Sequence, residues 1–282
     1  MPDYRLLVVD IDGTLVGRDG RIRPRVRAAI QAALARGVRV ALCTGRPLRA
    51  CRPLVAALGL TGPQIAFDGA LVSDSAGTTV VLRQPVANRA LAALYAWARA
   101  VDLCLELYTE AGYYIDRPWP ESRRHGALIG LPPVVADYGP LLASATLIKG
   151  QFVVADPARR ALVEACLATA PSDLRFAWAK PPPDLPGLDF VNITHPAVDK
   201  GTAVRALAAY YGLPLTAVMA VGDGPNDLPF LRVAGLAVAM GNACEAVKAA
   251  AHVVTAPLEE DGLALAVERF LLSRPVQTGR TG

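Results

Sequence analysis

Long hydrophobic runs, paired cysteines and blocks of positive charge are all missing from this sequence of 282 residues. A membrane-spanning helix needs about 20 mostly apolar residues in a row. The mean hydropathy is high, at +0.33, but the most apolar stretch, residues 202–221, is interrupted by Arg205, Gly212 and Pro214. The first five residues lack the basic start and apolar segment of a signal peptide. We therefore expect a soluble, cytoplasmic protein with no membrane partner.

Lysine is scarce, because only four of the 29 basic residues are lysine and the others are arginine. The formal net charge is +4, and no five basic residues stand in a row. A nucleic-acid-binding protein concentrates its basic residues in a patch or stripe. The spread of arginine instead predicts a solvated surface and no nucleic-acid partner.

The five cysteines are an odd number and include no Cys-x-x-Cys pair. Most of them stand in apolar segments, which is typical of buried, reduced thiols and not of disulfides or zinc ligands. These cysteines are Cys43, Cys51, Cys104, Cys166 and Cys244.

Short apolar runs alternate with helical patterns at both ends of the chain, which predicts a parallel sheet with right-handed crossovers. The expected strands are residues 4–10, 38–43, 64–67, 217–222, 236–240 and 252–255. The expected helices are residues 24–36, 47–58, 200–211, 226–233, 243–250 and 261–272.

The middle of the chain has a different rhythm. A hairpin is expected at 70–83, helices at 86–101 and 157–170, and strands at 103–109, 113–116, 146–155 and 174–179. Residues 117–144 are rich in proline, glycine and arginine and have no clear pattern. The predicted fold class is α/β: a Rossmann-like parallel-sheet core of residues 1–83 and 191–282, with an α+β domain inserted at 84–190.

Four short segments stand just past a predicted strand or at the start of a predicted helix, where open α/β sheets bind ligands. The first, residues 10–15, carries Asp10 and Asp12 two residues apart. Alone, this pair is more typical of a turn. An EF-hand is excluded, because its twelfth loop position would require glutamate and here holds Arg21. The second segment, Thr44-Gly45-Arg46, offers a hydroxyl and free backbone N–H groups to a phosphate, although alone it is a common turn.

The third segment places Lys200 at the start of a helix, where the helix dipole favours an acid. This position makes sense if the lysine contacts an anion, although a surface lysine is the simpler interpretation. The fourth segment, residues 222–227, holds Asp223, Asn226 and Asp227. Gathering Asp223 and Asp227 beside the first pair costs free energy unless a cation neutralises them, and all-oxygen ligands favour Mg²⁺.

Together these segments resemble the haloacid dehalogenase-like phosphatase superfamily, and within it the Cof-type hydrolases with an α/β cap of type IIB. The resemblance covers nearly the whole chain and includes residues 239–243 and 260–262. One departure is Asp68, where the family commonly has asparagine. This leaves the local backbone turn plausible and the hydrogen bonding around it open.

The resemblance implies that Asp10 is the nucleophile and Asp12 the general acid and base. It also implies a magnesium ion bound by the carboxylates of Asp10 and Asp223 and by the backbone carbonyl of Asp12. Asp227 would orient Lys200 or metal-bound waters.

The phosphoryl oxygens would be held by a set of donors from three segments. These residues are Thr44, Gly45, Arg46, Lys200 and Asn226. Lys200 thereby counts among the catalytic groups.

The expected function is a Mg²⁺-dependent phosphatase for small phosphorylated metabolites, either sugar phosphates or phosphorylated cofactors. The alternatives are a phosphomutase and a non-catalytic regulator that binds phosphorylated ligands. The sequence leaves the oligomeric state unknown.

Several aromatic, basic and histidine residues could contact a substrate from the cap, or could be structural. The candidate contacts, expected in an irregular loop, are Arg117, Trp119, Arg123, Arg124 and His125. The residues expected to be structural are Trp97, Trp178, His195 and His252, with His195 at a hinge.

Overall fold

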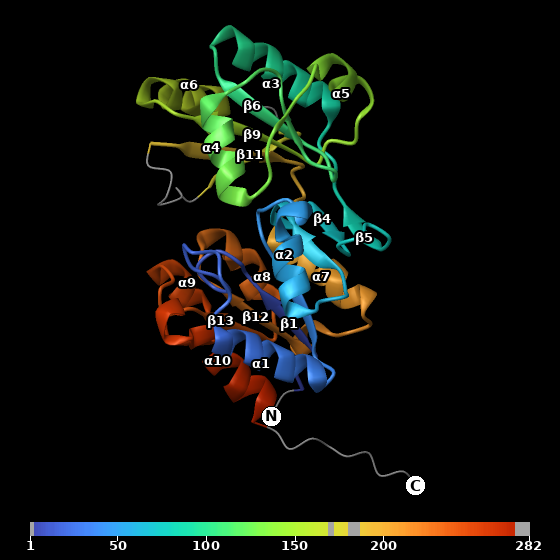
Figure 1. Ribbon diagram of the computed structural model, residues 1–282, viewed down its shortest axis with the longest axis vertical. Coiled ribbons are helices and arrows are strands. Elements are labelled where there is room, and N and C mark those ends of the chain that lie inside the picture. The colour runs from blue at the N-terminus through green and yellow to red at the C-terminus, as the bar shows by residue number, and fades with distance from the viewer. Residues whose placement is uncertain (1–2, 169–171, 180–186, 274–282) are drawn as a thin grey trace. The chain divides into compact units, whose positions relative to one another are not determined.

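The computed structural model (Figure 1) describes residues 3–168, 172–179 and 187–273. By Cα proximity the chain divides into two compact units. The first unit comprises residues up to 44, 53–81 and 199 onward, and the second comprises residues 45–52 and 82–198. Within the described ranges, no helix is both long and apolar enough to cross a membrane.

The first unit is built on a five-stranded sheet in the order β14-β13-β12-β1-β2, and every pairing in it is parallel. Its strands are β1 (Leu6–Val9), β2 (Arg39–Leu42), β12 (Val218–Gly222), β13 (Leu236–Ala239) and β14 (Val253–Val254). Every residue of β1 and β12 is buried, as expected of central strands in a parallel sheet covered on both faces. The parallel-sheet prediction is confirmed.

Helices and short helical turns connect these strands (Figure 1). The helices are α1 (Pro24–Ala35), α2 (Leu48–Leu58), α7 (Lys200–Tyr210), α8 (Leu228–Val233), α9 (Glu245–Ala250) and α10 (Gly262–Val267). The turns are η1 (Phe67–Gly69), η2 (Leu215–Ala217), η3 (Pro225–Asp227), η4 (Leu258–Glu260) and the π-helical η5 (Glu268–Leu272). The expected helices at 226–233 and 261–272 are therefore each divided, since η3 precedes α8 and η5 continues α10.

A three-stranded sheet in the order β3-β4-β5 follows α2. Its strands are β3 (Gln64–Ala66), β4 (Leu71–Ser73) and β5 (Val80–Arg83). A parallel bridge between Cys43 and Ile65 places β3 beside the end of β2. The turn η1 between β3 and β4 is thereby brought to the residues that follow β2.

The second unit is a six-stranded sheet in the order β10-β11-β9-β6-β7-β8. Its strands are β6 (Cys104–Tyr108), β7 (Tyr113–Ile115), β8 (Val134–Val135), β9 (Lys149–Val154), β10 (Arg175–Trp178) and β11 (Asp189–Thr194). Its helices are α3 (Asn88–Ala100), α4 (Pro120–Ile129), α5 (Tyr138–Ser144) and α6 (Pro157–Ala168). The pairings are antiparallel except between β7 and β8.

The two faces of this sheet differ because side chains alternate along a strand. Leu105 and Leu107 of β6 belong to an apolar core that also includes buried side chains of α3, α5 and α6. Trp97 and Trp178 pack against this core, which confirms their predicted structural role. Glu106 and Tyr108 project to the other face, where α4 contributes contacts to Glu106.

The structure corrects three expectations. The boundary expected after residue 190 would divide β11, whose residues pair with β9 and β10, and the second unit continues to residue 198. Residues 117–144, expected to be irregular, contain α4 and α5. The cysteines are free, as predicted, but Cys244 is exposed and Cys166 is half-buried.

Candidate active site

Asp10 follows β1 directly, and its backbone N–H donates to the carbonyl of Val221 at the end of β12. Its carboxylate is buried and accepts a hydrogen bond from Lys200 Nζ at 2.7 Å. Lys200 is the first residue of α7 and is 1 % exposed. The simpler interpretation of Lys200 as a surface lysine is therefore wrong.

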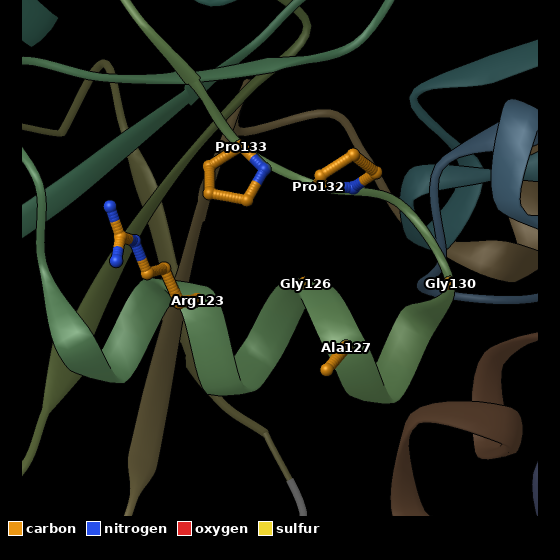
Figure 2. A pocket seen from close by; sticks show the side chains of 6 residues that line it. All are labelled: Arg123, Gly126, Ala127, Gly130, Pro132 and Pro133. Carbon is orange, nitrogen blue, oxygen red and sulfur yellow. The ribbon is translucent and has the colours of Figure 1, made fainter.

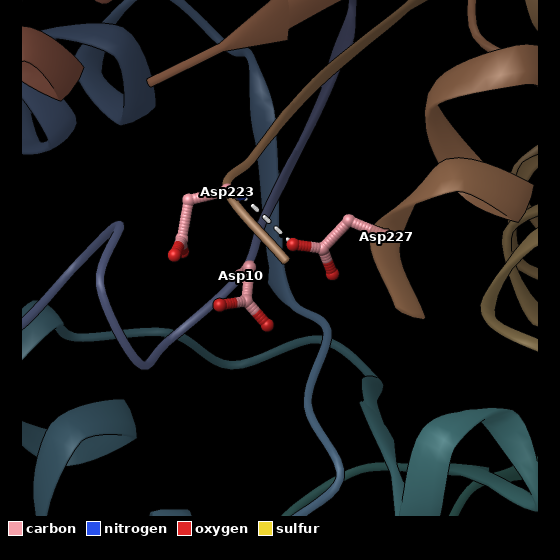
Figure 3. Close-up of side chains that lie close together, drawn as sticks. All are labelled: Asp10, Asp223 and Asp227. Carbon is pink, nitrogen blue, oxygen red and sulfur yellow. Dashed lines mark hydrogen bonds between the residues drawn. The ribbon is translucent and has the colours of Figure 1, made fainter. Parts of the chain in front are cut away.

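Asp227 is the second partner of Lys200, with 2.6 Å between Nζ and Oδ1. Its other oxygen, Oδ2, accepts hydrogen bonds from the backbone N–H groups of Asp223 and Gly224 at 2.9 and 2.8 Å. Asp227 therefore holds both the ammonium group and the loop after β12. Figure 3 shows the carboxylates of Asp10, Asp223 and Asp227 gathered at this point.

Gly13 and Thr14 bring the loop after β1 against Asp223. Thr14 Oγ1 donates to Asp223 Oδ1 at 2.9 Å. Gly13 has φ +94°, and a Cβ added there would lie 2.5 Å from Asp223 Oδ2, so this position requires glycine. Asn242 donates to the carbonyl of Gly13 and accepts from the N–H of Leu258. The role of Asn242 in holding this loop was not predicted, because it joins segments far apart in the sequence.

Carboxylate oxygens of Asp10, Asp223 and Asp227 lie within 4.8 Å of one another, and all three residues are buried. Burial, followed by the charge of Asp227, raises the pKa of Asp10 well above its ordinary value, although Lys200 opposes the shift. Burial disfavours the charged ammonium of Lys200, yet Asp10 and Asp227 raise its pKa well above the ordinary value. The Lys200 ammonium thus contacts two of the three buried carboxylates.

This cluster fits a divalent cation, because a cation would offset the burial and the neighbouring negative charges that raise the pKa of Asp10. Its donors are all carboxylate oxygens, which are the ligands of a hard ion such as Mg²⁺. Asp10 and Asp223 are the candidates to hold the ion, since both oxygens of Asp227 already accept hydrogen bonds.

The other predicted site residues stand around this cluster or beside it in the chain. Asp12 is exposed, and its charge contributes to raising the pKa of Asp10. Thr44 is buried, and its carbonyl accepts from the N–H of Asp68. Asn226 is exposed and donates to Asp68 Oδ1 at 3.0 Å.

Gly45 and Arg46 follow Thr44 in the chain and are grouped with the second unit. Both are half-buried.

His125 was expected in an irregular loop, but it lies on α4 and is buried. Its Nδ1 lies 3.0 Å from Glu106 Oε2. Glu106 also accepts from Tyr108 Oη at 2.5 Å, Ser122 Oγ at 2.6 Å and Gln151 Nε2 at 3.0 Å. His125 and Ser122 thereby attach α4 to the sheet, which is a structural role that no local pattern indicated.

Of the remaining candidate contacts in the second unit, Arg123 and Arg124 are exposed residues of α4, and Arg117 and Trp119 interact with neighbouring side chains. Arg117 pairs with Asp102 and stacks over the ring of Trp119, whose Nε1 donates to Asp116. The ring of His252 accepts from the N–H of Ala237, as expected of a structural residue.

A hollow of about 400 Å³ lies between α4 and the segment that follows it (Figure 2). Its lining residues are Arg123, Gly126, Ala127, Gly130, Pro132 and Pro133. Arg123 is the one charged side chain of this lining, so the hollow supplies no group for acid–base or metal chemistry.

Comparison with known proteins finds relatives over nearly the whole chain. The family of haloacid dehalogenase-like hydrolases matches residues 7–137 and 185–267. YxeH of Bacillus subtilis (strain 168), named provisionally as a phosphatase, is 30 % identical in an alignment 283 positions long that covers 96 % of this chain and 100 % of that protein. The 5-amino-6-(5-phospho-D-ribitylamino)uracil phosphatase YcsE of the same organism is 26 % identical in an alignment 275 positions long that covers 96 % of this chain and 97 % of YcsE.

Solved structures agree with these relatives. A haloacid dehalogenase-like hydrolase from Bacteroides thetaiotaomicron has a TM-score of 0.83 and 27 % identity, covering 95 % of this chain and 99 % of that one. A subclass IIB sugar phosphatase of the same superfamily has a TM-score of 0.80 and 25 % identity, with 95 % and 99 % covered. The family match covers well over half of the sequence, and the chain therefore belongs to the haloacid dehalogenase-like hydrolases.

Proposed function

We propose that this protein is a Mg²⁺-dependent phosphatase that hydrolyses small phosphate monoesters through an aspartyl-phosphate. The observation that carries the proposal is the buried group of Asp10, Asp223, Asp227 and Lys200 at the ends of β1 and β12. Two relatives are named as phosphatases, one of them for a phosphorylated ribitylamino-uracil, and a structural relative is a sugar phosphatase. These names support sugar phosphates or phosphorylated cofactors as the substrate class.

In the first proposed step, a carboxylate oxygen of Asp10 attacks the phosphorus atom. The bond between phosphorus and the leaving oxygen breaks, and Asp12 gives its proton to the departing alkoxide. The hydrogen bond from Lys200 to Asp10 Oδ1 supports this role, because it fixes the orientation of the carboxylate. The exposure of Asp12 lets it meet both the leaving group and water.

In the second step, water attacks the phosphorus atom and gives a proton to Asp12. The bond between phosphorus and Asp10 breaks, which releases inorganic phosphate and restores the carboxylate. Asp12 thus ends the cycle protonated, as it began it. The second step needs no group beyond those of the first.

The carboxylates of Asp10 and Asp223, with the backbone carbonyl of Asp12, would hold Mg²⁺. When bound, the ion would polarise the phosphoryl group and offset its charge against the carboxylates. Asp227 would keep Lys200 and the loop at Asp223 in place, since its two oxygens already bind both.

The phosphoryl oxygens need donors besides the metal. We propose that Lys200, the Thr44 hydroxyl and Asn226 supply them, with Gly45 and Arg46 extending the set along the chain. Donors aimed at the transferred group stabilise the charge that redistributes in the transition state.

The test is phosphate release from p-nitrophenyl phosphate and from a panel of phosphorylated metabolites. EDTA should abolish turnover and Mg²⁺ should restore it. Asp10→Asn should reduce kcat by at least about a thousandfold, and Asp12→Asn by roughly a hundred- to ten-thousandfold. Glu245→Gln removes an exposed carboxylate from α9 and should leave kcat unchanged.

Wild-type turnover by Asp10→Asn would contradict the proposed nucleophile. An isomerised phosphate ester in place of inorganic phosphate would indicate the phosphomutase instead. Binding of phosphorylated ligands without any turnover would indicate the regulator.

A further inference from the structure

The turn η1 between β3 and β4 has an unusual backbone. Phe67, Asp68 and Gly69 have φ values of +52°, +55° and +105°. Residues other than glycine rarely adopt positive φ values, and bulky aromatic residues do so least of all. Residues with strained backbones of this kind cluster at functional sites. The surrounding structure must therefore stabilise this turn through specific contacts.

Two segments of the first unit hold the turn. The N–H of Asp68 donates to the carbonyl of Thr44 at 2.9 Å. A Cβ added to Gly69 would lie 2.4 Å from the carbonyl oxygen of Asp199, the residue that caps α7. The turn is thus packed between the segment after β2 and the helix that begins with Lys200.

This conformation presents the Asp68 carboxylate to the loop after β12. Asp68 Oδ1 accepts from Asn226 Nδ2 at 3.0 Å, across 158 positions of sequence. The charge of Asp68 also contributes to raising the pKa of Lys200. Asp68 is half-buried, whereas Asp10, Asp223 and Asp227 are buried. It is therefore a fourth acid at the edge of the site, beyond the three that could share a cation.

We infer that Asp68 is a positioning and specificity-determining residue of this site, an inference that rests on the proposed phosphatase function. Its carboxylate fixes the Asn226 amide and leaves the second N–H of that amide to donate to a phosphoryl oxygen. The same negative charge disfavours any substrate whose leaving group carries a further negative charge close to the ester. Leaving groups that are neutral polyols or that carry an ammonium group are favoured.

Two variants separate the positioning from the charge. Asp68→Asn removes the charge but keeps an oxygen that can accept from Asn226, and asparagine tolerates the left-handed backbone. Asp68→Ala removes both the charge and the acceptor. If Asp68 positions Asn226, the alanine variant should have a KM for p-nitrophenyl phosphate several-fold higher than the asparagine variant has.

The effect of the Asp68 charge on ligand binding is tested with two phosphate esters. Glycerol 3-phosphate carries a hydroxymethyl group where 3-phosphoglycerate carries a carboxylate. Both are used as competitive ligands during Mg²⁺-dependent hydrolysis of p-nitrophenyl phosphate. In Asp68→Asn, the ratio of the Ki for 3-phosphoglycerate to the Ki for glycerol 3-phosphate should fall about tenfold, as expected for a loss of about 1.4 kcal/mol of repulsion. The change should shrink as salt is added.

Glu245→Gln is the matched control, since it removes the same charge from an exposed helix position and should leave the ratio unchanged. An unchanged ratio in Asp68→Asn, or equal KM values in the asparagine and alanine variants, would overturn the inference while phosphatase activity persists. Absence of wild-type phosphate release from p-nitrophenyl phosphate and from the metabolite panel would overturn the proposed function, and the inference with it.

Discussion

Replacing Lys200 by methionine tests the electrostatic account of the site. Methionine keeps most of the apolar stem and removes the ammonium group. The side chain of Lys200 is 1 % exposed, and its two contacts, at 2.7 and 2.6 Å, are with carboxylates whose side chains are 10 % and 0 % exposed. The variant leaves the buried carboxylates of Asp10 and Asp227 without their cation. Breaking a buried pair in this way costs about 3–5 kcal/mol of unfolding free energy.

The size of the loss should depend on pH. The pKa of Asp10 is already raised by burial and by Asp227, and Lys200 is the group that opposes this shift. Losing the ammonium therefore raises the pKa of Asp10 further. A carboxyl group with a raised pKa in the folded state binds a proton more tightly there than in the unfolded chain. Proton binding therefore stabilises the folded state at low pH, and this stabilisation is lost as the pH rises through the folded pKa. Lys200→Met should consequently be destabilised more at pH 7 than at pH 5.

The assay is thermal unfolding in EDTA, followed by a titration with Mg²⁺. At about 2–4 °C per kcal/mol for a domain of this size, the midpoint of the first unit should fall by roughly 6–20 °C. Lys248→Met is the matched control, because Lys248 pairs with Glu245, whose side chain is 91 % exposed, and such pairs contribute less than about 1 kcal/mol. Mg²⁺ should recover part of the loss. A midpoint for Lys200→Met equal to that of Lys248→Met in EDTA would refute the reasoning.

Two further predictions concern single positions. Gly13→Ala should weaken Mg²⁺ binding, measured by isothermal titration, at least tenfold, because the added Cβ would lie 2.5 Å from Asp223 Oδ2. The control is Gly37→Ala, where φ is +79° and no atom lies within 4 Å of the added Cβ, so that this variant has the backbone strain alone and should bind the ion normally. Equal binding by both variants would contradict the steric role of Gly13. Burial opposes ionisation of Glu106, yet His125 and hydrogen-bond donors keep its pKa below the ordinary value. Its stabilising effect is therefore present above the unfolded pKa and lost as the pH falls through the folded value. Glu106→Gln should lower the unfolding free energy at pH 7 by about 3 kcal/mol and flatten its decline between about pH 5 and 3, and an unchanged acid limb in urea unfolding would contradict this.

The position of the site could be predicted because it follows from a local pattern and a topological rule. The apolar run Leu6–Val9 indicated a strand buried on both faces, and all four residues are fully buried. Strands of a parallel sheet end at the same edge, so Asp10 and Asp223 were expected to meet. Their carboxylates do meet, with that of Asp227.

The surroundings of the site were harder to predict because they depend on contacts between distant segments. Nothing near Lys200 in the sequence shows that Asp10, 190 positions away, will bury its ammonium. Helix α4 was missed because the surrounding stretch, residues 117–144, is rich in proline, glycine and arginine and has no clear pattern. The attachment of α4 through Ser122 to Glu106 is also non-local. The orientation of Asp68 depends on a left-handed backbone conformation, which the local sequence allows but does not predict.

The two buried ionic groups described in this protein differ in what surrounds their carboxylates. In the second unit, one carboxylate, Glu106, accepts from three donors and contacts His125, and these partners hold its pKa below the ordinary value despite its burial. In the first unit, three carboxylates have oxygens within 4.8 Å of one another, and one ammonium contacts two of them. The pKa of Asp10 is raised there, first by burial and then by the charge of Asp227. Burying carboxylates that repel one another costs folding free energy, and binding a divalent cation would offset that free energy. Burial and the charge of neighbouring carboxylates together oppose ionisation of Asp10, and this is what favours a metal site at the ends of β1 and β12.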